Sequence, residues 1–231
     1  MKKSIFFIIV LAAFICVEYA QAQEAARTHP DTSESGWEDL FAPDLSNADD
    51  PSGVWSVEDG TFTASEDEAL WTAQSYNDYI LDLEVKLGER ANSGVVIHAS
   101  DTDDWIPNSV EIQVGDDYDP DRTEPPRNTQ SGSAFGHKAP SKQMMKPAGE
   151  WNRYTISAIG DEIWVVVNGE LVTEIDMKDF TSAEANPDGS RIPEWLSKPL
   201  ASLPSEGYIG FQGKHGGAPI WFRQIKIKEL D

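Results

Sequence analysis

Short runs of strand-forming residues recur along most of this chain, and tight turns separate them. The runs are rich in Val, Ile, Trp, Tyr and Phe, and the turns contain Gly, Pro, Asn and Asp; examples of the runs are YILDLEVKL, SGVVIHA, VEIQV and EIWVVVNGELVTEI. The one candidate for a short helix is Pro193–Ser197. Many short strands with little helical periodicity are typical of a sandwich or jelly roll. We therefore predict an all-β domain.

The segment 110–114 shows the period-two pattern of a half-buried strand. Val110, Ile112 and Val114 alternate with Glu111 and Gln113. Successive side chains of a strand point to opposite faces of the sheet. We therefore expect one face to pack in the core, while the other presents a carboxylate and an amide.

Two connections between the predicted strands are informative. Asn168-Gly169 joins IWVVV to ELVTEI, and an Asn-Gly pair tolerates the positive φ angles of a type I′ turn, so a hairpin is predicted there. The interval from Gly115 to Glu150 has many prolines, glycines and charges but no sustained strand. Connections this long are usually functional or disordered, and our hypothesis is that this one folds back over the strand that precedes it.

The first 22 residues have the pattern of an export signal. A basic start, Met1 to Lys3, precedes an apolar run from Ile5 to Val17 and a small-x-small cleavage site at Ala20 to Ala22. The apolar run is short for a membrane span. We expect cleavage after Ala22 and a periplasmic or secreted protein that has no membrane partner. The alternative is a lipoprotein anchored at Cys16.

The mature chain is expected to hold one domain. Residues 23–35 are polar and lack periodicity, which predicts a disordered leader. Residues 36–231 then form a single sandwich, since all-β folds of this length are commonly one domain. The sequence does not define the oligomeric state.

The acidic composition restricts the class of partner. The formal net charge is -22, which disfavours nucleic acid because phosphate recognition depends on Lys and Arg. Two acidic runs, DTDD at 101–104 and DDYDPD at 116–121, lack the spacing of an EF-hand loop. No cofactor is required by the sequence, although calcium or a catalytic transition metal stays open.

The order of segments resembles the 3-keto-disaccharide hydrolase family. The resemblance rests on GWEDLFAPDLS, VWSVEDGTF, ANSGVVIHAS, VEIQV, SGSAFG, KPAGEWNRYTI, VVVNGELV and GYIGFQGKHGGAPIWFRQIKIKEL, in that order. It covers nearly all of the chain after the leader. It implies a concanavalin A-like jelly roll of two curved antiparallel sheets, with a concave face that binds sugar. It also implies a secreted or periplasmic enzyme whose substrate is a glycoside oxidised to a ketone at carbon 3.

Such a substrate defines which catalytic groups are needed. The ketone acidifies the proton on carbon 2, and removal of that proton expels the glycosidic oxygen from carbon 1. Water addition to the resulting enone completes a net hydrolysis. A general base, a donor to the enolate oxygen and an acid for the leaving group are therefore required.

Glu111, His215 and His98 are the catalytic candidates. By strand parity, His98 and Gln212 share the open face of Glu111 and Gln113 if their strands are neighbours. Each candidate has an ordinary structural alternative: a solvated strand glutamate, a buried hydrogen-bonded histidine or a histidine in a glycine-rich turn. The candidates for substrate binding are Gln113, Gln212, Lys214, Arg223, Trp105, Tyr118 and His137.

Three other hypotheses stay open at this stage. A divalent metal held by His98, Glu111 or His215 could polarise the ketone. A carbohydrate-binding module without catalysis would use the same aromatic and amide residues. An ordinary glucanase would need a second carboxylate close to Glu111, and Gln113 stands where that acid belongs.

Overall fold

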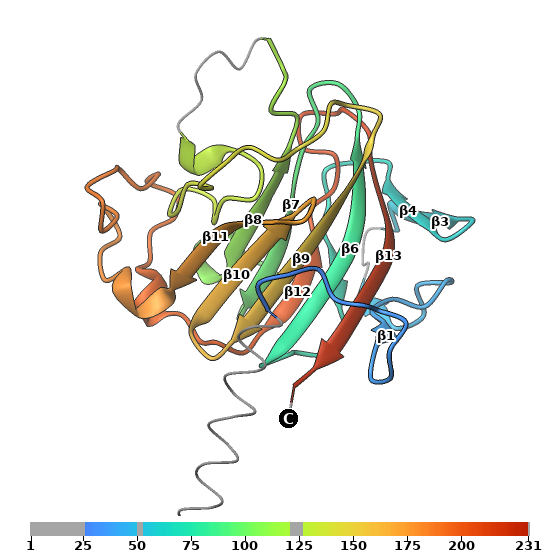
Figure 1. Ribbon diagram of the computed structural model, residues 1–231, viewed down its shortest axis with the longest axis horizontal. Helices are drawn as coiled ribbons and strands as arrows, with labels where there is room; N and C mark the ends of the chain where they lie inside the picture. Colours follow the sequence, from blue (N-terminus) through green and yellow to red (C-terminus); the bar gives the residue numbers. More distant parts are fainter. Residues whose placement is uncertain (1–25, 50–52, 121–126, 231) are drawn as a thin grey trace, which may run out of the picture.

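Two antiparallel sheets pack face to face in the computed structural model, which describes residues 26–49, 53–120 and 127–230 (Figure 1). Sheet A has the order β11-β10-β9-β6-β13-β4-β3, with β1 also paired to β13, and sheet B has the order β2-β5-β12-β7-β8. The strands of sheet A are β1 (Glu38–Asp39), β3 (Trp55–Glu58), β4 (Thr61–Ala64), β6 (Tyr79–Leu87), β9 (Trp151–Ile159), β10 (Glu162–Val167), β11 (Glu170–Asp176) and β13 (Ile220–Glu229). Those of sheet B are β2 (Ala48–Asp49), β5 (Leu70–Thr72), β7 (Asn92–Ala99), β8 (Val110–Gly115) and β12 (Tyr208–Phe211).

Helical structure in the described residues is confined to single turns of 3-10 helix, namely η1 (Ile106–Asn108), η2 (Arg127–Thr129), η3 (Met177–Asp179) and η4 (Leu200–Ser202). The all-β jelly-roll sandwich predicted from the sequence is confirmed. The helix expected at Pro193–Ser197 is wrong, because that stretch is a turn closed by a hydrogen bond from the Leu196 amide to the Pro193 carbonyl. None of the helices in the described ranges is long and apolar enough to cross a membrane.

The core lies between the inner faces of the two sheets. Leu81, Leu83 and Val85 of β6 are fully buried, as are Val95 of β7 and Ile112 of β8. The predicted hairpin is confirmed, because Asn168 and Gly169 take φ angles of 49° and 91° between β10 and β11. The alternation of apolar residues thus determines which face of each strand joins the core.

Part of the long connection after β8 pairs with that strand instead of lying across it. The Phe135 amide donates to the Glu111 carbonyl and the Gln113 amide donates to the Ser133 carbonyl, at 2.8 and 3.0 Å. Ala134 bridges Ile112 and faces the core. Residues 132–135 therefore extend sheet B by one edge segment.

Residues 26–35 are ordered, whereas the sequence predicted a disordered leader over 23–35. Their first part, the strap 26–30, lies on the outer face of sheet A. The Ser157 hydroxyl donates to the Ala26 carbonyl, and Arg153 donates to the Pro30 carbonyl at 2.6 Å. This cover explains why Asp82, on the outer face of β6, is only 5% exposed. The predicted signal segment 1–22 lies outside the described residues.

His29 anchors the strap through a directional chain of hydrogen bonds. The Gly169 amide donates to Nε2 of His29 at 2.8 Å, so this nitrogen carries no proton. Nδ1 therefore carries the proton and lies 2.7 Å from the Thr155 hydroxyl, which donates to Asp82 at 2.5 Å. Burial, followed by the charge of Arg153, lowers the pKa of His29 to about 4. The neutral imidazole of His29 is therefore the form that makes these hydrogen bonds.

We predict that the strap loses its contribution to stability in acid. In the unfolded chain His29 binds a proton below its ordinary pKa of 6.5, but the folded protein binds it only near pH 4. The stability contributed by His29 is therefore full above pH 6.5 and is lost as the pH falls through 4. Urea unfolding of wild type and His29→Ala should differ by about 2 kcal/mol at pH 7.5 and by much less at pH 4. An equal difference at both pH values would contradict this assignment.

Candidate active site

The outer face of sheet B carries a row of side chains that the register defines. Gly210 of β12 pairs with Val96 of β7, which pairs with Glu111 of β8. Trp71 of β5 pairs with Gly210 from the other side. Because Glu111 lies between the core residues of β8, its side chain must point outward from the sandwich.

Two glycines allow side chains of neighbouring strands to lie flat against this outer face. A β-carbon added to Gly94 would lie 2.3 Å from Oε1 of Glu111, and one added to Gly210 would lie 2.3 Å from the ring of Trp71. The Glu111 carboxyl therefore lies across β7, and the indole lies across β12. Glycine inside a strand often marks such a close approach.

The position of the Glu111 carboxyl changes its acid strength. Glu111 is half-buried, and no hydrogen bond to its carboxyl is found within the described ranges. Burial raises its pKa to about 8, because removal from water disfavours the charged form. At neutral pH this carboxyl is therefore mostly protonated and can donate a proton or a hydrogen bond.

A cavity of about 420 Å³ opens on the same outer face. Trp71 and Trp105 form part of its wall, with ring centroids 6.2 Å apart at an edge-to-face angle of 63°. Gln212 and His215 also line it, so three of the predicted site residues meet there. Lys214 lies between these last two in the chain and is half-buried.

His215 forms a pair that the sequence did not suggest. Its Nδ1 lies 2.6 Å from Oδ2 of Asp67, and both side chains are about half exposed, at 52% and 46%. The backbone of His215 bridges Asn92 of β7. With Nδ1 donating to Asp67, Nε2 keeps a free lone pair.

Gln113 is closed off from any ligand, contrary to its predicted role in substrate binding. It is 1% exposed, because residues 129–133 cover it. Its Nε2 donates to Oδ1 of Asn92 at 3.1 Å and to the Thr129 carbonyl at 3.4 Å. Gln113 therefore holds the edge segment and Asn92 in position.

His98 does not share the open face, although strand parity predicted that it would. The register between β7 and β12 shifts by one residue between Val96 and Ala99, and both of these contact the outer cluster around Trp71. Ile97 and His98 lie between these two residues, and the bulge turns both of them inward. His98 has a φ of 56° and is fully buried, and its burial lowers its pKa to about 4.

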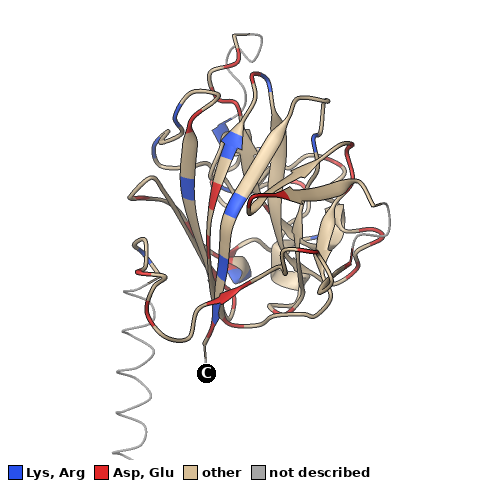
Figure 2. Ribbon diagram, turned by 90° about the vertical axis from the view of Figure 1, so that its right-hand side faces the viewer, with Lys and Arg blue, Asp and Glu red and all other residues tan. Residues whose placement is uncertain are grey.

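Arg223 lies on the opposite side of the molecule, on the outer face of sheet A. It pairs with Glu84 at 2.6 Å, and its guanidinium lies 3.9 Å from the ring centroid of Trp151. Lys86 lies between the rings of Trp151 and Trp221, at 5.0 and 4.7 Å. Figure 2 shows Lys and Arg along the strands of this side. Arg223 therefore lies on the other face from Glu111 and forms a salt bridge, whereas the sequence made it a candidate for substrate binding.

Two further candidates lie away from the open face. His137 is 4% exposed and packs edge-on against Phe180 at 6.0 Å, and burial lowers its pKa to about 4. Tyr118 is 54% exposed on the connection after β8, and its hydroxyl donates to the Met145 carbonyl. Neither residue lines the cavity beside Trp71.

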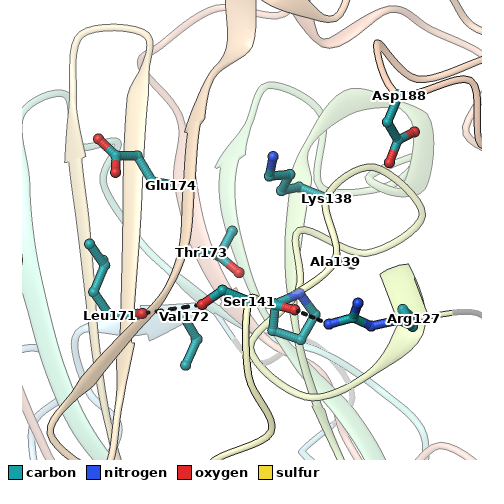
Figure 3. A pocket seen from close by; sticks show the side chains of 10 residues that line it. Arg127, Lys138, Ala139, Ser141, Leu171, Val172, Thr173, Glu174 and Asp188 are labelled. Atoms are coloured by element: carbon teal, nitrogen blue, oxygen red, sulfur yellow. Dashed lines mark hydrogen bonds between the residues drawn. The ribbon is translucent and has the colours of Figure 1, made fainter.

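A larger cavity of about 580 Å³ lies between β11 and the connection around Lys138 (Figure 3). Arg127 and Lys138 line it together with Glu174 and Asp188, but no aromatic residue and none of the predicted site residues does. The cavity beside Trp71 therefore fits a sugar better, despite its smaller volume.

The described ranges contain no group of three or more His, Cys, Asp or Glu side chains that could hold a metal ion. The three ligands suggested by the sequence are not brought together, because His98 faces the inner layer and His215 is paired with Asp67. In the acidic run 101–104, Asp101 accepts hydrogen bonds from the amides of Asp103 and Asp104 and so closes its own turn.

The sequence interpretation missed Trp71, Asp67 and the two glycines. It assigned no role in the site to Trp71, and Asp67 had no distinguishing pattern. A usable signal was present in SGVVIHA and YIGFQG, since each strand carries a glycine in its interior.

Comparison with known proteins relates this whole sandwich to carbohydrate-active proteins. Residues 31–228 match the profile of a family described as the 3-keto-alpha-glucoside-1,2-lyase-like domain. A 3-keto-disaccharide hydrolase from Bacteroides thetaiotaomicron is 28% identical over 206 residues, which cover 77% of this chain and 70% of that protein. A candidate glycosyl hydrolase of known structure from Parabacteroides distasonis is 47% identical, with a TM-score of 0.82; the match covers 84% of this chain and 99% of that one. Another from the same organism is 26% identical, with a TM-score of 0.62 and coverage of 85% and 84%.

We predict that Glu111→Gln stabilises the protein at alkaline pH. In the unfolded chain Glu111 ionises near its ordinary pKa of 4.5, but in the folded protein it ionises only near 8. Wild type therefore loses stability relative to the variant as the pH rises from 4.5 to 8, by about 2–4 kcal/mol.

Chemical denaturation at pH 4, 6 and 8.5 measures this difference. Glu58→Gln is the matched control, because Glu58 is an exposed glutamate on β3 in the other sheet, and the pH dependence of Glu111→Gln is compared with that of this variant. A pH-independent difference for Glu111→Gln would refute the assignment of a protonated carboxyl.

Proposed function

Because the chain belongs to the family of 3-keto-alpha-glucoside-1,2-lyase-like domains, we propose that it cleaves 3-keto-glycosides on the outer face of sheet B. The observation that carries this proposal is geometric: the outer face of sheet B holds both the half-buried carboxyl of Glu111, which lies over Gly94, and His215, whose ring is held by Asp67. These groups match an acid and a base for an elimination reaction.

The reaction requires little more than proton transfers. A base removes the proton on carbon 2, the electrons form the enolate of the 3-ketone, and the glycosidic oxygen leaves carbon 1 with a proton from an acid. Addition of water to the enone then gives net hydrolysis. Two ionised carboxylates on either side of the glycosidic bond are not needed, in contrast to ordinary glycosidases.

We assign the base to His215. Asp67 accepts from Nδ1, which fixes the tautomer that leaves Nε2 unprotonated and able to take the proton from carbon 2. Asp67 is therefore a positioning residue. A carboxylate hydrogen-bonded to the far nitrogen also stabilises the imidazolium that forms.

We assign the acid to Glu111. Its raised pKa keeps a proton available near neutral pH for the departing oxygen. The carboxyl lies over Gly94, and His215 bridges Asn92, two residues along the same strand. Two residues of strand span about 7 Å, and the two groups approach β7 from opposite sides, Glu111 from β8 and His215 from the segment after β12.

A carbohydrate-binding module without catalysis is the second candidate. The observation that favours it is the cavity beside Trp71 and Trp105, since aromatic faces suit the C-H side of a pyranose whether or not a reaction follows. An ordinary glucanase is disfavoured, because Gln113 is both uncharged and covered by residues 129–133. We also propose that the protein is exported, as the sequence of its first 22 residues predicts.

We predict turnover of a 3-keto-disaccharide but not of the same disaccharide before oxidation. Glu111→Gln and His215→Asn should each lower kcat by roughly 10²–10³, with KM within about threefold of wild type, because each removes one proton-transfer group. Asp67→Asn should lower kcat less, by roughly tenfold to a hundredfold, since it only orients the base.

Release of the second sugar, followed over time, measures these rates. Glu58→Gln is again the matched control and should behave as wild type. A folded wild-type protein that binds the ketone without cleaving it would support the binding module and overturn the enzyme.

A further inference from the structure

The cavity beside Trp71 carries an excess of negative charge. Among the residues that line it, four are carboxylates and none is Lys or Arg: Asp49, Asp67, Glu68 and Asp103. They come from three separate parts of the chain, namely β2, the turn before β5 and the connection after β7. The charge is therefore a property of the folded site and not of one acidic run.

Only one of these carboxylates has a basic partner in the described ranges. Asp67 pairs with His215, whereas the side chains of Asp49, Glu68 and Asp103 are exposed and form no salt bridge. Three formal negative charges thus face the same opening. Exposed charges of this kind contribute little to folding stability, but they act on any charged ligand that enters.

The rest of the lining is suited to an uncharged ring. Trp71, Trp105 and Ile106 supply apolar surface, while Gln212 and the carboxylates supply hydrogen-bond acceptors for hydroxyl groups. A volume of about 420 Å³ lies within the usual range for ligand pockets. A sugar ring can stack on an indole and donate its hydroxyls to the carboxylates.

The proposed reaction indicates which ring lies in this cavity. The proposed reaction requires the 3-keto ring between Glu111 and His215, and we place the leaving ring against Trp71 and Trp105, in the cavity that His215 also lines. The cavity beside β11 differs in charge, because Arg127 and Lys138 line it (Figure 3). Of these two cavities, the one beside Trp71 is lined by the proposed base, His215.

We propose that the leaving ring is uncharged or cationic, and that the site rejects glycosides whose leaving ring carries a carboxylate, sulfate or phosphate. This specificity rests on the proposed function and adds the class of substrate to it. A like charge at about 6 Å lowers affinity roughly threefold at the dielectric constant of bulk water and about a hundredfold at the effective value of about 20 used near a protein surface, so an exposed carboxylate falls between these limits. Glu68 and Asp103 are two of the three lining carboxylates that are unpaired in the described ranges, so removing both should remove most of the discrimination.

A matched series of 3-keto-disaccharides tests this proposal, with glucose, glucosamine or glucuronate as the leaving ring. We expect kcat/KM for the glucuronate to be at least about 30-fold below that for glucose, and the glucosamine to equal or exceed glucose. The double variant Glu68→Gln/Asp103→Asn should raise kcat/KM for the glucuronate about tenfold relative to that for glucose, because the amides keep a hydrogen-bond acceptor but lose the charge. Equal rates for all three, or no recovery in the variant, would overturn the proposal.

The charge-matched control is Glu58→Gln/Glu184→Gln, which removes two exposed carboxylates outside the cavity and should leave the ranking unchanged. If none of the three ketones is cleaved, the proposed function fails, and binding of methyl glucoside, glucosaminide and glucuronide, measured by NMR, then tests the charge selection alone. The same ranking in affinity would support the selection, and equal affinities would refute it.

Discussion

Burial of Val110, Ile112 and Val114 between the two sheets fixes the orientation of the whole of β8. Because these side chains fill the core and side chains alternate along a strand, the Glu111 side chain points to the outer face. The neighbouring strand then determines what that carboxyl contacts: Glu111 pairs with Val96, and its carboxyl lies over Gly94, the diagonal neighbour, which has no side chain. The carboxyl can lie flat on the sheet, where it loses water without gaining a charged partner. Its raised pKa follows from that geometry.

The two outer faces of the sandwich differ in how fully their polar groups are used. On sheet A, the strap covers Asp82, and the cations of β6 and β13 pair with carboxylates or lie against tryptophan rings. On sheet B, the Glu111 carboxyl and the lone pair of His215 have no partner of that kind in the described ranges. Polar groups that folding leaves unused are the ones available to a substrate. This difference, together with the cavity beside Trp71 and Trp105, favours the outer face of sheet B as the location of the active site.

Local patterns were sufficient to predict the sandwich, the outward direction of Glu111 and the hairpin at Asn168, because each depends only on alternation or on one turn. The position of His98 depends on a bulge relative to β12, and a single strand does not reveal its own bulge. Arg223 was misplaced because its sheet partner, β6, is more than 130 residues away in the chain. Gln113 follows the same rule as Glu111 but is covered by a connection whose path the sequence does not specify. Gly94 and Gly210 could be read from the sequence, but only the strand register shows which side chains, Glu111 and Trp71, lie over them.

The central claim is that the outer face of sheet B, between Glu111 and the two tryptophans, is where a 3-keto-glycoside is cleaved. A crystal structure of Glu111→Gln with a bound 3-keto-disaccharide tests it most directly. The account predicts the keto ring between residue 111 and His215, with Nε2 of His215 within hydrogen-bonding reach of carbon 2 and the second ring against Trp71. A disaccharide bound instead beside Arg127 and Lys138, or on the outer face of sheet A, would contradict it.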